Sequence, residues 1–200
     1  MAVFLRKNMN EANFQDDLKK CVNILKEGGL ILYPTDTIWG IGCDATNDAA
    51  VKKIFELKKR PDTKTLIILV AEDRDILKYT SCPNLNVFTF LKNAQKPTTI
   101  IYEGAIGLAQ SVINGEGSAA IRVVKDTFCK QLIKQFGRPI VSTSANISGE
   151  SSPQLFGEIS EKISEGVDYV VHYRRDEQIK QQASSIIKFN KNGSLTVLRP

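Results

Sequence analysis

Residues 29–40 read GLILYPTDTIWG, and residues 138–149 read RPIVSTSANISG. Each stretch begins with an apolar run and ends in Ser, Thr, Asp or Asn side chains, a pattern typical of a buried strand that leads into a polar loop. In α/β proteins, ligands bind where strands end in such loops. The basic segment Lys58-Lys59-Arg60-Pro61 lies between the two stretches in sequence. Two polar loops facing a cationic one predict a pocket for an anion that also carries hydroxyl or amino groups.

The composition predicts a soluble globular protein with one domain, residues 1–200. Hydrophobic residues make up 42% of the chain and charged residues 24%, and the net charge is +5. A basic chain favours anionic partners, although charge alone does not separate ATP from RNA. The cysteines form no Cys-x-x-Cys pair, which argues against a zinc or redox site. The sequence contains neither a secretory leader nor an apolar run of about 20 residues, so we expect a cytoplasmic protein without a membrane span.

Apolar periodicity predicts a series of helices and strands. Apolar residues at spacings of three and four predict a helix from Asn13 that ends at Gly28 and Gly29. Asn47 and Asp126 are expected to cap two further helices. Besides the two opening stretches, we expect strands at 3–5, 66–70, 98–102, 119–124, 169–172, 184–189 and 195–198, and helices at 74–79, 85–91 and 153–165. This pattern predicts one α/β domain with a twisted mixed β-sheet flanked by helices.

The basic segment predicts two cations directed at one anion. Pro61 disfavours the helical conformation for Arg60, so the chain is expected to extend there. In an extended chain, positions two apart share one side, so we expect Lys58 and Arg60 to converge. The alternative is a solvated basic helix end, favoured by the helix dipole. Arg122 stands alone on the polar side of the predicted strand 119–124.

Several common catalytic and nucleotide-binding motifs are missing. His172 is the single histidine, and no Gly-x-Ser-x-Gly occurs, which argues against a Ser-His-Asp hydrolase. The chain lacks the Gly-x-x-x-x-Gly-Lys-Ser/Thr motif of P-loop proteins. Gly40-Ile-Gly42 begins a dinucleotide fingerprint, but Ala45 stands where its third glycine would be. A nucleotide would therefore bind without the common motifs.

The strings YPTDTIWGIGCDATN, KKRP, AIRV and STSANISG, in this order, resemble the YrdC-domain family from about Leu25 to Arg199. The resemblance implies a YrdC-like fold with an open, positively charged, concave active-site surface. It also implies L-threonylcarbamoyladenylate synthase activity, which joins L-threonine, bicarbonate and ATP and releases pyrophosphate. The product serves N6-threonylcarbamoyladenosine formation in tRNA, through a separate downstream transferase complex. Longer relatives carry an appended C-terminal domain.

The family motifs assign roles to individual residues of this chain. The resemblance gives as catalytic residues Lys58, Arg60, Ser144 and Asn146. It gives as threonine-binding residues Thr37, Arg122, Ser142 and Ser184. It gives as ATP-binding residues Arg60, Lys64, Ser118, Ser144, Ser152 and Arg199. No protein metal ligands are expected, and Mg²⁺ is expected to bind through the phosphates.

One acidic and two aromatic residues in or beside the first polar stretch also have purely structural interpretations. Asp36 could help to hold a metal, but a local turn hydrogen bond is an equally good interpretation. Trp39 and Tyr33 are expected to pack in the core rather than to stack on a base.

Departures from the family pattern keep two alternatives open. Thr65, Leu69, Val124 and the segment 172–178 differ from residues common in the family. The chain could be a related adenylating enzyme that uses another amino acid or carbamoyl substrate. It could also be a non-catalytic module that binds double-stranded RNA or tRNA, as its positive charge permits. Oligomeric state, substrate order and loop closure are not predicted by the sequence.

Overall fold

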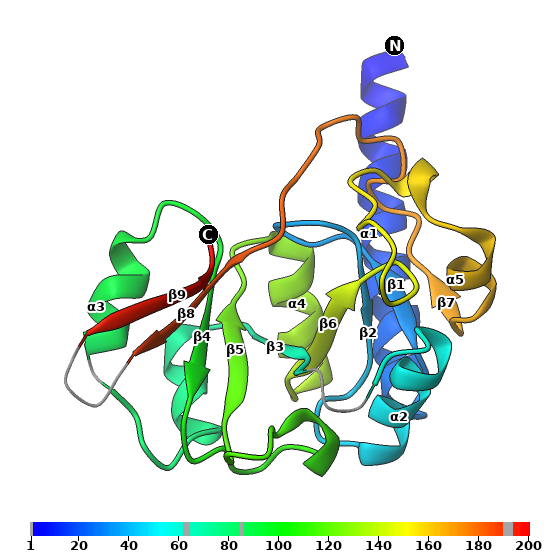
Figure 1. The fold of residues 1–200 in the computed structure, drawn as a ribbon. Coiled ribbons are helices and arrows are strands. Elements are labelled where there is room, and N and C mark those ends of the chain that lie inside the picture. The colour runs from blue at the N-terminus through cyan, green and yellow to red at the C-terminus, as the bar shows by residue number, and fades with distance from the viewer. Residues whose placement is uncertain (1, 62–64, 85, 190–193) are drawn as a thin grey trace.

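The computed structural model of the chain describes residues 2–61, 65–84, 86–189 and 194–200, and for residues 2–12 it describes the backbone alone. The helices in these ranges are α1 (Ala2–Lys26), α2 (Asp48–Leu57), α3 (Asn86–Asn93), α4 (Thr127–Phe136) and α5 (Glu161–Glu165), with short 3-10 helices η1 (Asp73–Lys78), η2 (Gln110–Val112) and η3 (Phe156–Glu158). The strands are β1 (Ile31–Tyr33), β2 (Gly40–Gly42), β3 (Ile67–Val70), β4 (Thr98–Tyr102), β5 (Ala119–Val123), β6 (Ile140–Ser144), β7 (Tyr169–Val170), β8 (Ser185–Phe189) and β9 (Leu195–Arg199) (Figure 1).

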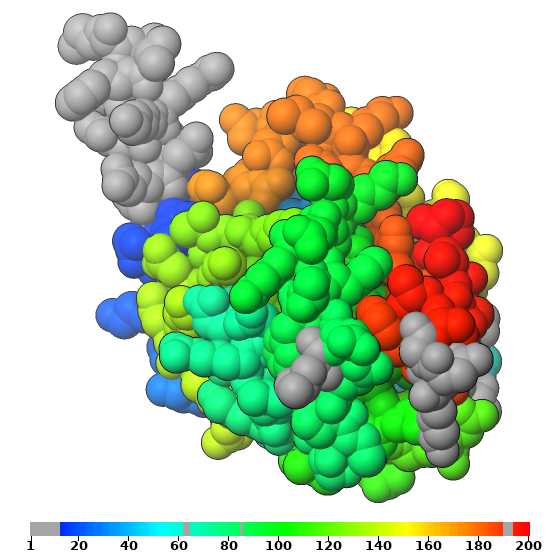
Figure 2. All heavy atoms as spheres, turned by 90° about the vertical axis from the view of Figure 1, so that its left-hand side faces the viewer, coloured from blue at the N-terminus to red at the C-terminus, as the bar shows by residue number. Residues whose placement is uncertain are grey.

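The described strands join one sheet in the order β7-β1-β2-β6-β3-β5-β4-β8-β9. The pairs β1/β7, β3/β5 and β4/β8 are parallel, and the other neighbours are antiparallel. The sheet is therefore mixed, and helices flank it, which confirms the predicted α/β class. Seen from the side of the β8–β9 hairpin, α3 and its flanking turns, in green, cover the middle of the molecule, with the hairpin, in red, beside them (Figure 2).

The first helix is longer than predicted. Residues 3–5, which we expected to form an edge strand, belong to α1. A run of three apolar residues does not distinguish strand from helix, and no proline or glycine between residues 2 and 12 interrupts the helix that continues through Asn13. The predicted core face is confirmed, because Leu18, Cys21 and Leu25 are buried. None of the described helices is long and apolar enough to cross a membrane.

The predicted N-terminal caps of helices α2 and α4 are confirmed. The Asn47 side chain accepts a hydrogen bond from the Ala50 backbone N–H at 3.2 Å, and Asp126 accepts one from the Cys129 N–H at 2.8 Å. Helix α4 then ends at Gly137, whose φ of +78° is the left-handed conformation that glycine adopts without a steric penalty. This helix packs against α1 through an edge-to-face contact of Phe14 and Phe128, with ring centroids 5.4 Å apart.

The C-terminal third departs most from the prediction. The expected helix 153–165 is divided into η3 and α5, in a segment that contains Pro153 and Gly157, both poor helix formers. The expected strand 169–172 is shorter, because the backbone N–H of His172 donates to the buried carboxylate of Asp17 instead of a strand. The antiparallel β8–β9 hairpin is confirmed, although its expected Asn192-Gly193 turn lies outside the described residues.

Strands β1 and β2 approach each other closely at a glycine. A Cβ atom on Gly42 would lie 2.6 Å from Cε1 of Tyr33 and 2.7 Å from the carbonyl oxygen of Val141. Tyr33 itself is fully buried, as predicted for a core residue, and its hydroxyl donates to the Val141 carbonyl oxygen at 3.2 Å. Only glycine at position 42 lets the ring fill this space.

We predict that Gly42→Ala lowers the free energy of unfolding by about 1–3 kcal/mol, because the added methyl group must displace a buried ring or backbone. Thermal and chemical denaturation would measure this change. Gly115→Ala is the matched control, since a Cβ there would meet no atom within 4 Å. Equal effects of the two substitutions would contradict the packing argument.

Candidate active site

The sheet register gathers polar side chains on one face. Arg122 on β5 pairs with Leu69 and Thr99, and Ile67 pairs with Ser142 on β6. Gly40 on β2 pairs with Ser144 at the end of β6. Paired residues in neighbouring strands, and residues two apart in one strand, point to the same face. This face forms the floor of a cavity of about 170 Å³.

Most of the predicted site residues line this cavity. Those that do are Thr37, Arg60, Arg122, Ser142, Ser144, Ser152, Ser184 and Arg199. Trp39 also lines it, although it is largely buried as predicted. The lining contains three arginines and, among the described residues, no acidic side chain. Such a cavity attracts anions.

Four predicted residues are placed differently. Lys58 and Asn146 lie behind the cavity wall and do not line it. Ser118 is buried at the opposite end of β5 from Arg122, so the structure does not bring it to the cavity. It was assigned by its position in the family pattern, and three strand residues separate it from Arg122. Lys64 lies outside the described residues.

The expected convergence of Lys58 and Arg60 through an extended chain is wrong. Lys58 keeps helical backbone angles at the end of α2, with φ −82° and ψ −5°. Lys59 then adopts a positive φ of +48°, so the backbone turns instead of extending. The side chain of Arg60 consequently reaches the cavity, whereas that of Lys58 turns to the loop after β6.

Lys58 is a buried cation that holds the loop after β6. Its side chain is 1% exposed, and its Nζ donates to the carbonyl oxygens of Ser144 and Asn146. The Lys58 carbonyl oxygen in turn accepts a hydrogen bond from the Ser148 N–H at 2.8 Å. Burial, reinforced by the nearby positive charge of Arg60, lowers the pKa of Lys58 to about 8.

The same loop carries an oxygen with no partner. Nδ2 of Asn146 donates to the carbonyl oxygens of Ile147 at 2.9 Å and Glu150 at 2.8 Å. Its Oδ1 is buried and accepts no hydrogen bond from the described residues. A buried acceptor without a donor is unfavourable, so this oxygen is available for a ligand donor or bound water.

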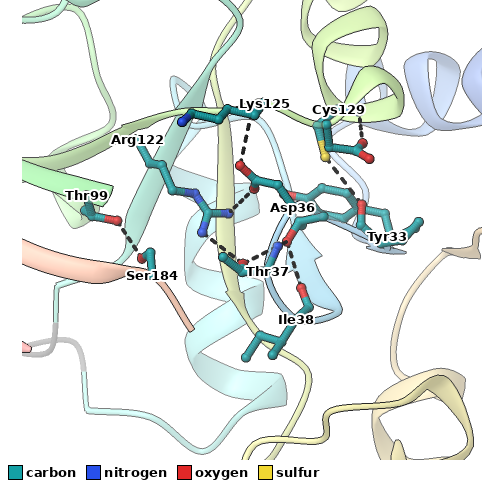
Figure 3. Close-up of polar contacts among 12 residues, drawn as sticks. Tyr33, Asp36, Thr37, Ile38, Thr99, Arg122, Lys125, Cys129 and Ser184 are labelled. Carbon is teal, nitrogen blue, oxygen red and sulfur yellow. Dashed lines mark hydrogen bonds and ion pairs between the residues drawn. The ribbon is translucent and has the colours of Figure 1, made fainter. Parts of the chain in front are cut away.

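Arg122 is held by two adjacent residues of the first polar loop (Figure 3). Its Nη1 donates to Oγ1 of Thr37 at 2.9 Å, and its Nη2 lies 3.3 Å from Oδ1 of Asp36. The other carboxylate oxygen of Asp36 accepts the Lys125 backbone N–H at 3.0 Å. Asp36 therefore does not make the local turn hydrogen bond that we considered.

Thr35 orders the hydroxyl groups of this loop. Its hydroxyl donates to the Ile38 carbonyl oxygen at 2.8 Å, and its oxygen lies 2.9 Å from that of Thr37. Because Thr35 has one hydroxyl proton, the Thr37 hydroxyl must donate to Thr35. Thr37 then accepts from Arg122, and it has no proton left for a ligand.

The C-terminal strands complete the cavity. The hydroxyl of Ser184 lies 2.8 Å from that of Thr99 (Figure 3). Arg199 donates through Nε to the Ser184 carbonyl oxygen at 2.8 Å and through Nη2 to its hydroxyl at 3.2 Å. We considered Asp36 only as a metal-holding or turn residue, and we did not single out Thr35 or Thr99 as site residues. Thr99 pairs in register with Arg122, and this pairing of strands β4 and β5 is the signal that would have identified Thr99.

Comparisons with known proteins give the family of the chain. Residues 23–200 match the family model Sua5_yciO_yrdC, described as "Telomere recombination". The threonylcarbamoyl-AMP synthase of Idiomarina loihiensis is 31% identical over 146 residues, which cover 72% of this chain and 78% of that protein. The enzyme of the same name from Saccharophagus degradans is 39% identical over 147 residues, covering 72% and 76%.

Solved structures show the same fold. P. abyssi Sua5, solved in complex with L-threonine, superposes with a TM-score of 0.81 at 25% identity. The match covers 92% of this chain and 53% of that one, so this chain spans about half the length of that protein. E. coli YciO has a TM-score of 0.78 at 21% identity, which supports the fold.

We predict that Lys58→Met lowers the free energy of unfolding by about 2–4 kcal/mol, because one buried and one partly buried carbonyl oxygen lose their donor. Chemical denaturation at neutral pH would measure it. Lys53→Met is the matched control on the same helix, where an exposed lysine donates to a single carbonyl oxygen, that of Gly28, at 2.9 Å. If Lys58→Met lowered the free energy of unfolding no more than Lys53→Met does, Lys58 would not hold the loop.

Proposed function

The chain belongs to the Sua5–YciO–YrdC family, and on this premise we propose that it is a threonylcarbamoyl-AMP synthase. The reaction joins the amino group of L-threonine to bicarbonate with loss of water, and the resulting carbamate oxygen attacks the α-phosphorus of ATP. The bond from that phosphorus to the bridging oxygen breaks, and pyrophosphate leaves. The observation that carries the proposal is one cavity in which Arg60, Arg122 and Arg199 face hydroxyl groups.

The Arg122 side of the cavity suits the amino acid. A guanidinium group binds a carboxylate through two parallel N–H donors, so Arg122 is the proposed clamp for the threonine carboxylate. The Thr37 hydroxyl has already given its proton to Thr35, so it can only accept a hydrogen bond, as from the threonine amine. The hydroxyls of Ser142 and Ser184 are the proposed partners of the threonine side chain.

The Arg60 and Arg199 side of the cavity suits phosphates. Negative charge shifts between phosphate oxygens as pyrophosphate leaves, and fixed cations stabilise that shift. Arg60 is fixed by donation from Nη2 to the Thr65 carbonyl oxygen at 3.0 Å. Lys58 does not line the cavity, but its charge lies next to Ser144, so it is proposed to attract the phosphates without touching them. Ser144 and Ser152 are the proposed neutral donors, and the predicted role of Lys64 stays a prediction.

Magnesium is proposed to arrive with ATP. No group of three His, Cys, Asp or Glu side chains gathers for a metal within the described ranges. The oxygen of the cavity lining that fits such an ion is the hydroxyl of Ser144, whereas the buried Oδ1 of Asn146 does not line the cavity. Mg²⁺ keeps most of its ligands as water and phosphate oxygens, and when bound it neutralises phosphate charge.

The proposed product determines the partners. A carbamoyl adenylate is a mixed anhydride that reacts with water, so a transferase must consume it soon after release. We propose that this transferase modifies adenosine in tRNA and that the protein acts in the cytoplasm. Direct binding of tRNA or double-stranded RNA to the basic surface remains a second proposal, supported by the net charge of +5.

We predict that the purified protein releases pyrophosphate from ATP only when L-threonine and bicarbonate are both present. Arg60→Met should lower kcat/KM for ATP by about 10²–10³, because a fixed cation is lost. Lys59→Met, which removes the neighbouring exposed lysine, is the control. No pyrophosphate release, together with tRNA binding that weakens steeply with salt, would favour the binding module.

An amino-acid series would test the alternative enzyme. Leu69 pairs in register with Arg122 and is fully buried, so an apolar side chain lies beside the proposed clamp. If L-threonine is the substrate, its kcat/KM should exceed that of L-serine, which lacks the methyl group, by about tenfold or more. A higher value for another amino acid would identify the related adenylating enzyme instead.

We predict a pH dependence from Lys58. Its pKa of about 8 means that the free enzyme loses the positive charge of Lys58 above that pH, so log kcat/KM for ATP should fall with a slope of about −1 above about pH 8. Bound triphosphate favours the charged form, so the corresponding decline in kcat should occur at higher pH. Coincident declines in both profiles would rule out Lys58 as the titrating group.

A further inference from the structure

We propose that Asp36 is a positioning residue that fixes Arg122 and thereby sets the affinity for the amino-acid substrate. The inference rests on the proposed function in one respect, because that function identifies the substrate as threonine. Asp36 does not line the cavity, so it would act through Arg122 and not by touching the ligand.

The first support is that Asp36 binds both the side chain and the backbone of one segment. Its Oδ1 lies 3.3 Å from Nη2 of Arg122, and its Oδ2 accepts the backbone N–H of Lys125 at 3.0 Å. Lys125 follows Arg122 by three residues, where the chain leaves β5. The carboxylate is therefore fixed to the strand end that carries the guanidinium group it pairs with (Figure 3).

The second support is that two neighbouring residues contact the two terminal nitrogens of the Arg122 guanidinium group. Thr37 accepts a hydrogen bond from Nη1, and Asp36 forms an ion pair with Nη2. The loop between β1 and β2 therefore contacts both terminal nitrogens of Arg122. The hydrogen bond to Thr37 and the ion pair with Asp36, whose Oδ1 accepts no hydrogen bond from the described residues, together oppose rotation about the last bonds of the arginine side chain. With one of them removed, the guanidinium group could turn about the other.

The third support is burial. The side chains of Arg122 and Asp36 are 3% and 9% exposed. A buried guanidinium group without a counter-charge is strongly unfavourable, and Asp36 is the acid with which Arg122 pairs. Nε of Arg122 still has no partner within the described residues, so the pair leaves a donor unused. Asp36 thus balances the charge while leaving Arg122 able to bind a carboxylate.

Asp36→Asn is the direct test. The asparagine keeps an oxygen that can accept the Lys125 N–H, but it loses the charge that pairs with Arg122. Isothermal titration of L-threonine into the full chain should give a dissociation constant raised by about tenfold or more, with KM for ATP unchanged within about twofold. Asp36→Glu should recover part of the affinity, because it restores the charge.

Asp44→Asn is the matched control. Asp44 is also a buried acid paired with an arginine, at 2.8 Å from Nη1 of Arg138 and with a side chain 2% exposed, but it does not line or support the cavity. Its substitution should leave threonine affinity unchanged within about twofold. Threonine affinity in Asp36→Asn equal to that of the original protein would overturn the proposal, as would equal weakening of threonine and ATP.

A second measurement separates this inference from the proposed function. Proton exchange at the Arg122 Nε–H, followed by nuclear magnetic resonance and assigned by its loss in Arg122→Lys, should accelerate in Asp36→Asn without any ligand. If the original protein bound no threonine, the proposed function would fail while this readout still tested the positioning role. Unchanged exchange in Asp36→Asn would overturn that role.

Discussion

The buried ammonium group of Lys58 is the constraint on which the cavity depends. It joins the end of α2 to the loop after β6, two segments far apart in the sequence, through the carbonyl oxygens of Ser144 and Asn146. Lys58 is buried, so removing it leaves a buried and a partly buried carbonyl oxygen without this donor. The loop that they fix carries the Ser144 hydroxyl in the cavity wall. A residue that does not line the cavity therefore determines the shape of one side of it.

Each cavity arginine is restrained by groups of the protein itself. Arg60 donates to a backbone carbonyl oxygen, Arg199 to both oxygens of Ser184, and Arg122 to Thr37. Cations held in this way need little rearrangement when a charged ligand binds or reacts, which is the main source of electrostatic catalysis. The cavity is thus organised for anions before any ligand arrives.

Local signals predicted local structure, and they failed where distant segments decide the outcome. The caps at Asn47 and Asp126 were predictable because each side chain binds a backbone group three residues away. The positive φ of Lys59 was not predictable, because residues other than glycine rarely adopt it, and it turned the backbone so that Arg60 and Lys58 point to different places. The partner of Asp36 lies 89 residues away and could not be read from the loop itself. The resemblance supplied most cavity residues, whereas their mutual contacts required the fold.

The segment between β7 and β8 has a consequence for how the site is composed. Residues 176–183 cross to β8 without regular structure and are mostly exposed (Figure 1). Thr37, Arg60 and Arg122 precede this segment, and Arg199 follows it. Strand β8 is bound to β4 along its length by parallel pairing. The site is therefore shared between two pieces of chain joined by one exposed connection, and fragments divided there could reassemble it by strand pairing alone.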